Sequence, residues 1–228
     1  MSSFDHLISR IRQSLNSGAP REPAAPNGAH PQPIAQPDLG GDELRAQFVA
    51  ALTAVGGAAI EAAGESEAIE KIAALLRSRA ARSAAIGEGI TTDSASAAAR
   101  LSHEGINVSV LDTCGPALFK EQLARVDAGI VEVDYAIAAT GTLVMAANSA
   151  RPRSLSLLPP INIAILRSDR ILPNLAAVLS SIGPQNIAAH PVVMVTGPSR
   201  TADIEKRIVI GVHGPKELYV ALIGDLRR

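Results

Sequence analysis

The sequence of 228 residues is poor in cysteine and in aromatic side chains, with one cysteine and 2% aromatics. The single thiol, Cys114, excludes a disulfide within the chain and a cysteine-based metal or iron–sulfur site built from this chain alone. The aromatic side chains are too few for the stacking platform that single-stranded nucleic acid requires. A reducing compartment is the simplest interpretation of this cysteine content.

The chain also lacks an excess of either charge and lacks long apolar segments. Its 21 Lys and Arg and 22 Asp and Glu give a net charge of −1, so we expect no basic surface for nucleic acid or for an anionic membrane. No run of about 18 apolar residues is free of charged and turn-forming residues, which argues against a transmembrane helix. Asp5, His6, Arg10 and Arg12 interrupt the apolar residues near the N-terminus, which is not typical of a signal peptide. We therefore expect a cytoplasmic protein.

The composition changes near residue 40. Residues 1–17 are expected to form an amphipathic helix, because apolar residues recur there at helical spacing: Phe4, Leu7, Ile8, Ile11 and Leu15. Residues 18–40 are expected to form a linker, since the stretch from 20 to 37 holds six of the 15 prolines and one large aliphatic side chain, Ile34. The helix is thereby tethered, and it docks either on its own domain or on a partner.

Residues 41–228 alternate between helical and strand patterns. Apolar residues at helical spacing predict helices within 44–55, 69–76, 118–126 and 175–182, the last opened by Pro173; runs of β-branched and aliphatic residues predict strands at 83–87, 106–111, 135–138, 142–146, 161–166, 192–196 and 218–223. This alternation predicts an α/β fold with a mainly parallel sheet covered on both faces. Ligands bind such folds beyond the carboxyl ends of the strands, so we expect the site there.

Two clusters of turn-forming and polar residues are candidates for that edge. In the first, Thr-Gly-Thr at 140–142, the glycine permits a tight turn flanked by two hydroxyls, and a plain hairpin turn is the alternative. The second places Arg151 and Arg153 ahead of a double proline at 159–160, which is typical of a stiff loop with a positive tip. An arginine fork suits a carboxylate or a phosphate, whereas the alternative is a solvated loop.

A third cluster lies between residues 196 and 205, where a strand runs through a glycine into a polar turn and a predicted helix start. This arrangement presents backbone N–H groups and a helix N-terminus to an anion, and Arg200 adds a positive charge. Capping of the helix by Ser199 or Thr201 is the alternative, although it explains Arg200 less well because a cation is unfavourable at a helix start. His213, set between turn-forming residues, is a candidate general acid or base, or a donor to a backbone carbonyl.

The segment TGPSRTADIEKRIVIGVHGPKELYVALI, residues 196–223, resembles the C-terminal signature of the lactate-utilisation protein C family (LutC/YkgG, also called LUD-domain proteins). Residues 136–143 and the Arg-x-Ser…Leu-Pro-Pro segment at 153–160 match further signatures in the same order. The resemblance implies a three-layer Rossmann-like domain similar to the sugar-phosphate isomerase and CoA-transferase superfamily. It also implies a role in the oxidation of L-lactate to pyruvate, beside two partner proteins that carry the iron–sulfur clusters.

Two residues depart from the family pattern. Ala139 stands where members commonly have Glu, and Asn162 stands where they commonly have His. Both differences remove a titratable group, because an amide forms hydrogen bonds but transfers no proton near neutral pH. We therefore expect an accessory, ligand-binding subunit that binds no cofactor itself. The alternatives are a stand-alone enzyme or sensor for an anionic small molecule (a CoA ester, sugar phosphate or folate-like carboxylate), and a chain whose turns only shape the sheet ends.

The candidate site residues fall into two groups. His213 and Asp203 are the candidate catalytic residues. The candidate ligand-binding residues are Thr140, Gly141, Thr142, Arg153, Asn162, Gly197, Ser199, Arg200 and Thr201. No metal site is expected, because the histidines have no partner at metal-ligand spacing.

Overall fold

The computed structural model describes residue 9 and residues 39–89, 93–110, 121–148, 151–202, 208–211 and 213–224. The chain divides into two units, Met1–Pro37 and Asp38–Arg228, and the elements below belong to the second. Apart from residue 9, the expected helix at 1–17 lies outside the described residues, as does nearly all of the expected linker at 18–40. Cys114, Asp203 and residues 118–120 of the helix expected at 118–126 also lie outside them.

A six-stranded parallel sheet forms the centre of the second unit. Its strands are β1 (Ala58–Ala62), β2 (Ser83–Ile86), β3 (Asn107–Val110), β4 (Ala128–Glu132), β7 (Ile161–Arg167) and β12 (Glu217–Ile223). Their order is β1-β12-β7-β4-β2-β3, and every neighbouring pair is parallel. The predicted mainly parallel sheet is confirmed. The sequence patterns miss β1 and β4, which are short and rich in alanine and glycine.

A second, four-stranded sheet has the order β8-β5-β6-β9. It comprises β5 (Tyr135–Ile137), β6 (Thr142–Ala146), β8 (Ile171–Leu172) and β9 (Val192–Val195). Strands β5 and β6 form an antiparallel hairpin, β9 is antiparallel to β6, and β8 is parallel to β5. The sequence predicts three of these strands but not their separation from the main sheet, because a short apolar run does not identify its pairing partner.

Helices cover both faces of the parallel sheet. Helices α3 (Glu65–Ser78) and α4 (Ser94–His103) pack on one face with Ile163 of β7. The other face, which includes Ala164 of the same strand, packs against α2 (Gly41–Ala54), α6 (Arg153–Leu157) and the second sheet. Neighbouring residues of a strand point to opposite faces, so β7 contributes to both cores. Strand β7 therefore reads as a continuous apolar run interrupted by Asn162.

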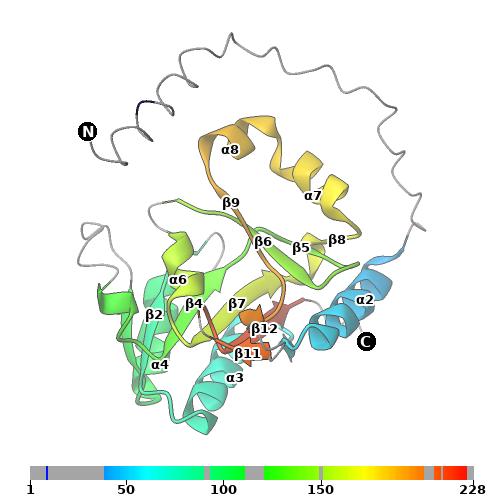
Figure 1. The fold of residues 1–228 in the computed structure, drawn as a ribbon. Helices are drawn as coiled ribbons and strands as arrows, with labels where there is room; N and C mark the ends of the chain where they lie inside the picture. The colour runs from blue at the N-terminus through cyan, green and yellow to red at the C-terminus, as the bar shows by residue number, and fades with distance from the viewer. Residues whose placement is uncertain are drawn as a thin grey trace, which may run out of the picture. The chain divides into compact units, whose positions relative to one another are not determined.

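Two short helices cover the outer face of the second sheet. Helix α7 (Leu175–Ile182) buries Val178 and Ile182 against the sheet, and α8 (Pro184–Ala189) follows after Gly183. Asn174 caps α7 by accepting a hydrogen bond from the backbone of Ala177, so the helix begins just after the predicted Pro173. In Figure 1 these two helices lie above β5, β6 and β9, while α3 and α4 lie on the far side of the parallel sheet.

The helix predicted to start near Thr201 is wrong. Arg200–Ala202 form a strand, β10, which pairs antiparallel with β11 (Ile208–Ile210). The β-branched residues Thr201, Ile208 and Val209 favour this hairpin, and pairing between the strands outweighs the local capping signal. Consequently residues 200–202 do not form a helix N-terminus that presents its N–H groups to an anion.

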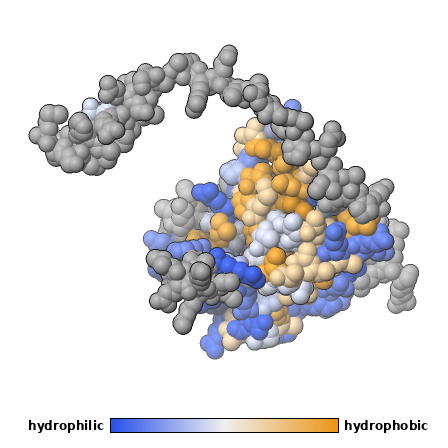
Figure 2. All heavy atoms as spheres, turned by 45° about the vertical axis from the view of Figure 1, so that its right-hand side comes forward, coloured by the Kyte–Doolittle hydropathy of each residue, from blue (hydrophilic) through white to orange (hydrophobic). Residues whose placement is uncertain are grey.

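Several large apolar side chains stay exposed around the second sheet. Leu175 of α7, Ile187 of α8 and Met194 of β9 are the clearest of these. Figure 2 shows apolar surface in the upper part of the molecule, over α7 and α8.

Among the helices in the described residues, none combines the length and the apolar character needed to cross a membrane.

Candidate functional site

The Thr-Gly-Thr turn joins β5 to β6 and packs on α2. The hydroxyl oxygen of Thr142 lies 2.7 Å from that of Thr140 and 2.9 Å from that of Thr196, at the end of β9. Gly141 has a φ of +63° and approaches α2 so closely that a Cβ atom there would lie 2.4 Å from the backbone nitrogen of Leu52. The glycine is therefore required by the turn and by the helix beneath it.

Arg200 and Gly197 both contact the C-terminal end of α2. The Arg200 Nη2 atom donates a hydrogen bond of 2.6 Å to the carbonyl oxygen of Val55, the residue that caps α2. A cation is favourable at a helix C-terminus, so this contact accounts for the arginine. Gly197 has a φ of +76°, and a Cβ atom there would lie 2.4 Å from the same carbonyl oxygen.

His213 lies on a different part of the surface. It is exposed and lines a pocket of about 400 Å³ together with Lys216 and Leu157. Ser199 borders this region, because its backbone nitrogen donates a hydrogen bond of 2.9 Å to the carbonyl oxygen of Pro215. Among the described residues, the pocket is not lined by Arg153, Asn162 or Arg200.

The remaining candidates do not join this group. Arg153 is exposed at the first position of α6. Asn162 is only 1% exposed, and its Oδ1 atom has no hydrogen-bond partner among the described residues. Thr201 lies in β10, and Asp203, the second candidate catalytic residue, lies outside the described residues. The structure thus brings Thr140, Thr142 and Thr196 together, and it brings Gly197 and Arg200 together at α2, but it assembles no single site from the candidates.

These groups lie at the amino edge of the parallel sheet, so their predicted location at the carboxyl edge is wrong. Val55 leads through Gly56 and Gly57 into the start of β1, Lys216 directly precedes β12, and Asn162 is the second residue of β7. The reason is the second sheet, whose β5–β6 turn packs against the C-terminal half of α2. A sequence pattern of strands and turns does not reveal that the β5–β6 turn packs against α2.

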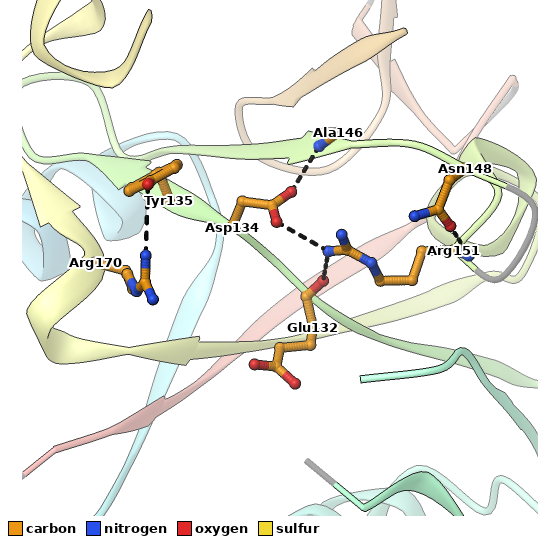
Figure 3. Close-up of polar contacts among 7 residues, drawn as sticks. All are labelled: Glu132, Asp134, Tyr135, Ala146, Asn148, Arg151 and Arg170. Carbon is orange, nitrogen blue, oxygen red and sulfur yellow. Dashed lines mark hydrogen bonds and ion pairs between the residues drawn. The ribbon is translucent and has the colours of Figure 1, made fainter. Parts of the chain in front are cut away.

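The carboxyl edge instead holds an ion pair, shown in Figure 3. Glu132 ends β4, and Asp134 follows on the way into β5. The Arg151 Nη1 atom donates to the Glu132 carbonyl oxygen at 3.3 Å and to the Asp134 Oδ1 atom at 3.2 Å. The other Asp134 oxygen accepts a 2.6 Å hydrogen bond from the backbone of Ala146. The Arg151 and Asp134 side chains are 11% and 17% exposed, so water screens this pair weakly.

Further polar groups continue this edge. Arg170 lies over the ring of Tyr135 at 5.6 Å, and its Nη1 atom donates to the Tyr135 hydroxyl at 3.4 Å. Hydrogen bonding to Asp169, with a smaller contribution from the charge of Glu132, raises the pKa of Arg167 at the end of β7. A sequence signal that could have indicated this edge is the pair of carboxylates at the end of an apolar run, Glu132 and Asp134.

No metal-binding group emerges from the part of the chain that the structure describes. It contains no cluster of three or more His, Cys, Asp or Glu side chains placed to hold an ion. The charges at the carboxyl edge are paired with each other instead, which leaves hydrogen bonding and charge complementarity as the chemistry available there.

Residues 45–223 match the LUD domain family. The chain belongs to this family. A crystal structure of a duf162 family protein from Deinococcus radiodurans has a TM-score of 0.60 and 23% identity, covering 82% of this chain and 99% of that one. This likeness shows a shared fold.

Curated relatives are about a third identical to this LUD-domain chain over the segments that align. Lactate utilization protein C of Exiguobacterium sp. is 34% identical over 119 residues, which is 50% of this chain and 52% of that protein. The protein of the same name from Halalkalibacterium halodurans is 32% identical over 109 residues, 46% and 47% of the two chains. The chain thus spans about half the length of these relatives. Uncharacterized protein YkgG of Escherichia coli is 31% identical over 169 residues, 72% and 73% of the two chains.

Proposed function

We propose that this LUD-domain chain is an accessory, ligand-binding subunit of an L-lactate utilisation system that acts with iron–sulfur partner proteins. The observation that carries this proposal is the kinship with proteins named lactate utilization protein C. Fold alone does not fix function, so the kinship is weighed together with what the described side chains do.

The described contacts favour an accessory role over catalysis by this chain alone. Arg200 is bonded to the end of α2, Thr142 is bonded to two other threonines, and Asn162 is sealed from solvent. A general acid or base must lie within hydrogen-bond reach of a substrate. His213 is exposed, but none of the other described candidates lines its pocket.

The surface supports association with partner proteins. Leu175, Ile187 and Met194 expose apolar side chains on α7, α8 and β9, and β9 is an edge strand of the second sheet. Exposed apolar surface and unpaired strand edges are typical of contacts with another chain. In the proposed function, this side of the domain is where a partner binds.

The proposal is tested by deleting the gene in its own host and measuring growth on L-lactate and L-lactate-dependent dye reduction in cell extracts. We expect both to be lost and to be restored by the intact gene. The tagged protein, purified from these cells, is expected to bring down proteins containing iron and acid-labile sulfide. Purified alone, it is expected to show no turnover.

The other outcomes identify the alternatives. Normal growth of the deletion strain on L-lactate would remove the chain from lactate utilisation. Turnover of L-lactate by the isolated chain would make it an enzyme in its own right rather than an accessory subunit.

A further inference from the structure

A small pocket lies beside the Asp134–Arg151 ion pair. Its volume is about 260 Å³, and its lining includes Arg151, Tyr135 and Asn186. These residues come from the segment before α6, from β5 and from α8, so several elements fix the shape of the pocket. The volume is below the range of roughly 300–1,000 Å³ that is typical of sites for drug-sized ligands. It therefore suits a molecule of a few heavy atoms.

Arg151 is held in place with part of its guanidinium unused. Both of its side-chain contacts, to Glu132 and Asp134, involve the Nη1 atom, as Figure 3 shows. Its backbone nitrogen donates to the Asn148 Oδ1 atom at 2.8 Å, which fixes the start of the side chain. Among the described residues, the Nε and Nη2 atoms have no acceptor. A guanidinium edge with two free donors binds a carboxylate in a bidentate manner.

The charges around the pocket favour a singly charged ligand. Asp134 neutralises Arg151, and its two oxygens are directed to Arg151 and to the backbone of Ala146. His190 also lines the pocket and is exposed. A polyphosphate needs several cations, and Arg151 is the one arginine or lysine among the described residues that line the pocket. Its Nε and Nη2 donors suit a single carboxylate.

The rest of the lining supplies neutral hydrogen-bonding groups. Ser181 contributes a hydroxyl. The Asn186 amide nitrogen donates to the Ile182 carbonyl oxygen at 2.9 Å, which leaves the amide oxygen of Asn186 as an acceptor. Together these groups suit a ligand that carries a hydroxyl or keto oxygen beside its carboxylate.

We infer that the pocket beside Arg151 binds a small monocarboxylate with a hydroxyl or keto oxygen, whose carboxylate is held by the Arg151 guanidinium. L-lactate and pyruvate belong to this class, and their choice as the first ligands rests on the proposed function. The pocket itself is argued from the described contacts.

The test is equilibrium binding of L-lactate, pyruvate, glycolate and inorganic phosphate to the full chain, measured by titration calorimetry. Ser181→Leu places an apolar side chain at the pocket, and Ser180→Leu is the matched control, because Ser180 is exposed next to it and does not line the pocket. We expect saturable binding of a small monocarboxylate, at least about tenfold weaker in Ser181→Leu and unchanged in Ser180→Leu. Arg151→Lys keeps the positive charge but removes the planar guanidinium that bonds a carboxylate through two donors, so it should weaken binding by a similar factor.

Circular dichroism spectra establish that each variant is folded. Absence of binding by any of the carboxylates to the folded native chain would overturn the inference. Equal binding by native chain and Ser181→Leu, or binding of phosphate in preference to the carboxylates, would overturn it as well. If the deletion strain cannot grow on L-lactate but the native chain binds no carboxylate, the inference about the pocket is wrong and the proposed function stands. If glycolate binds and Ser181→Leu weakens that binding, but the deletion strain grows normally on L-lactate, the proposed function is wrong and the inference about the pocket stands.

Discussion

Arg200 donates a hydrogen bond to the carbonyl oxygen of Val55, a residue 145 positions earlier in the chain. The contact joins the first residue of β10 to the C-terminal end of α2. The sequence offered this arginine as a ligand-binding group at a helix start, and the structure places it at a helix end instead. A positive charge is unfavourable at the N-terminus of a helix and favourable at its C-terminus.

We predict that Arg200→Ala lowers the free energy of unfolding by about 1 kcal/mol, because it removes a charge-assisted hydrogen bond from an exposed helix end. Urea denaturation measures the change. Arg125→Ala is the matched control: Arg125 is exposed, and no side-chain contact is seen for it in the described residues, so about 0.5 kcal/mol or less is expected. Equal effects of the two substitutions would show that the Val55 contact contributes nothing.

Gly141 offers a sharper prediction, because backbone strain and steric overlap can be separated there. Gly141→Ala combines a φ of +63° with a Cβ atom 2.4 Å from the backbone of Leu52. Gly105→Ala has a φ of +82° with no atom within 4 Å of the new Cβ. We expect about 1 to 2 kcal/mol of destabilisation for Gly105→Ala and about 3 kcal/mol or more for Gly141→Ala. Thermal unfolding of both variants gives the comparison, and similar values would mean that α2 moves aside freely.

The fold was largely predictable because the pattern that specifies it is local. The aliphatic run at 161–166 and the helical spacing of Ile69, Ile72 and Leu76 are sufficient to predict a buried strand and a helix that packs on it. The location of the site was not predictable. It depends on which strands pair with which, and β5, β6 and β9 pair away from the main sheet.

Arg151 illustrates the same limit within the site. The sequence marks it as part of a positive loop. Its partners are Glu132, 19 positions away, and Asp134, 17 positions away. These groups come together because the chain leaves β4 of the parallel sheet and enters β5 of the second sheet. The spacing of residues in the sequence does not predict this change of sheet.

Asp127 gives a pH dependence with a definite sign. Burial raises the pKa of its carboxyl group, but hydrogen bonds from the backbone of Arg82 and from Ser83 outweigh that effect, so the pKa is lowered overall. A lowered folded-state pKa contributes stability that is present above the unfolded value of about 3.9 and is lost as the pH falls through the folded value. We expect Asp127→Asn to cost about 1 kcal/mol at pH 7, and the difference from the native chain to shrink below about pH 4.

Urea denaturation between pH 7 and pH 3 measures this difference. Glu88→Gln is the control, because Glu88 is exposed and makes no ion pair or hydrogen bond seen in the described residues. A cost of Asp127→Asn that stays constant down to pH 3 would contradict the role assigned to these hydrogen bonds.

Asn162 is a buried polar residue whose cost to the fold can be measured. It is 1% exposed, and within the described part of the chain its Oδ1 atom has no hydrogen-bond partner. A buried unsatisfied carbonyl costs about 1–3 kcal/mol. Leucine has the same branching without the polar atoms, so Asn162→Leu should raise the free energy of unfolding by about 1 kcal/mol. Asn107→Leu, at an exposed position in β3, should bring no such gain, and urea denaturation compares the two. A loss of stability in Asn162→Leu would show that the amide is better paired than its surroundings indicate. If Asn162→Leu is more stable than the native chain but does not restore growth of the deletion strain on L-lactate, the Asn162 amide is needed for function and not for folding.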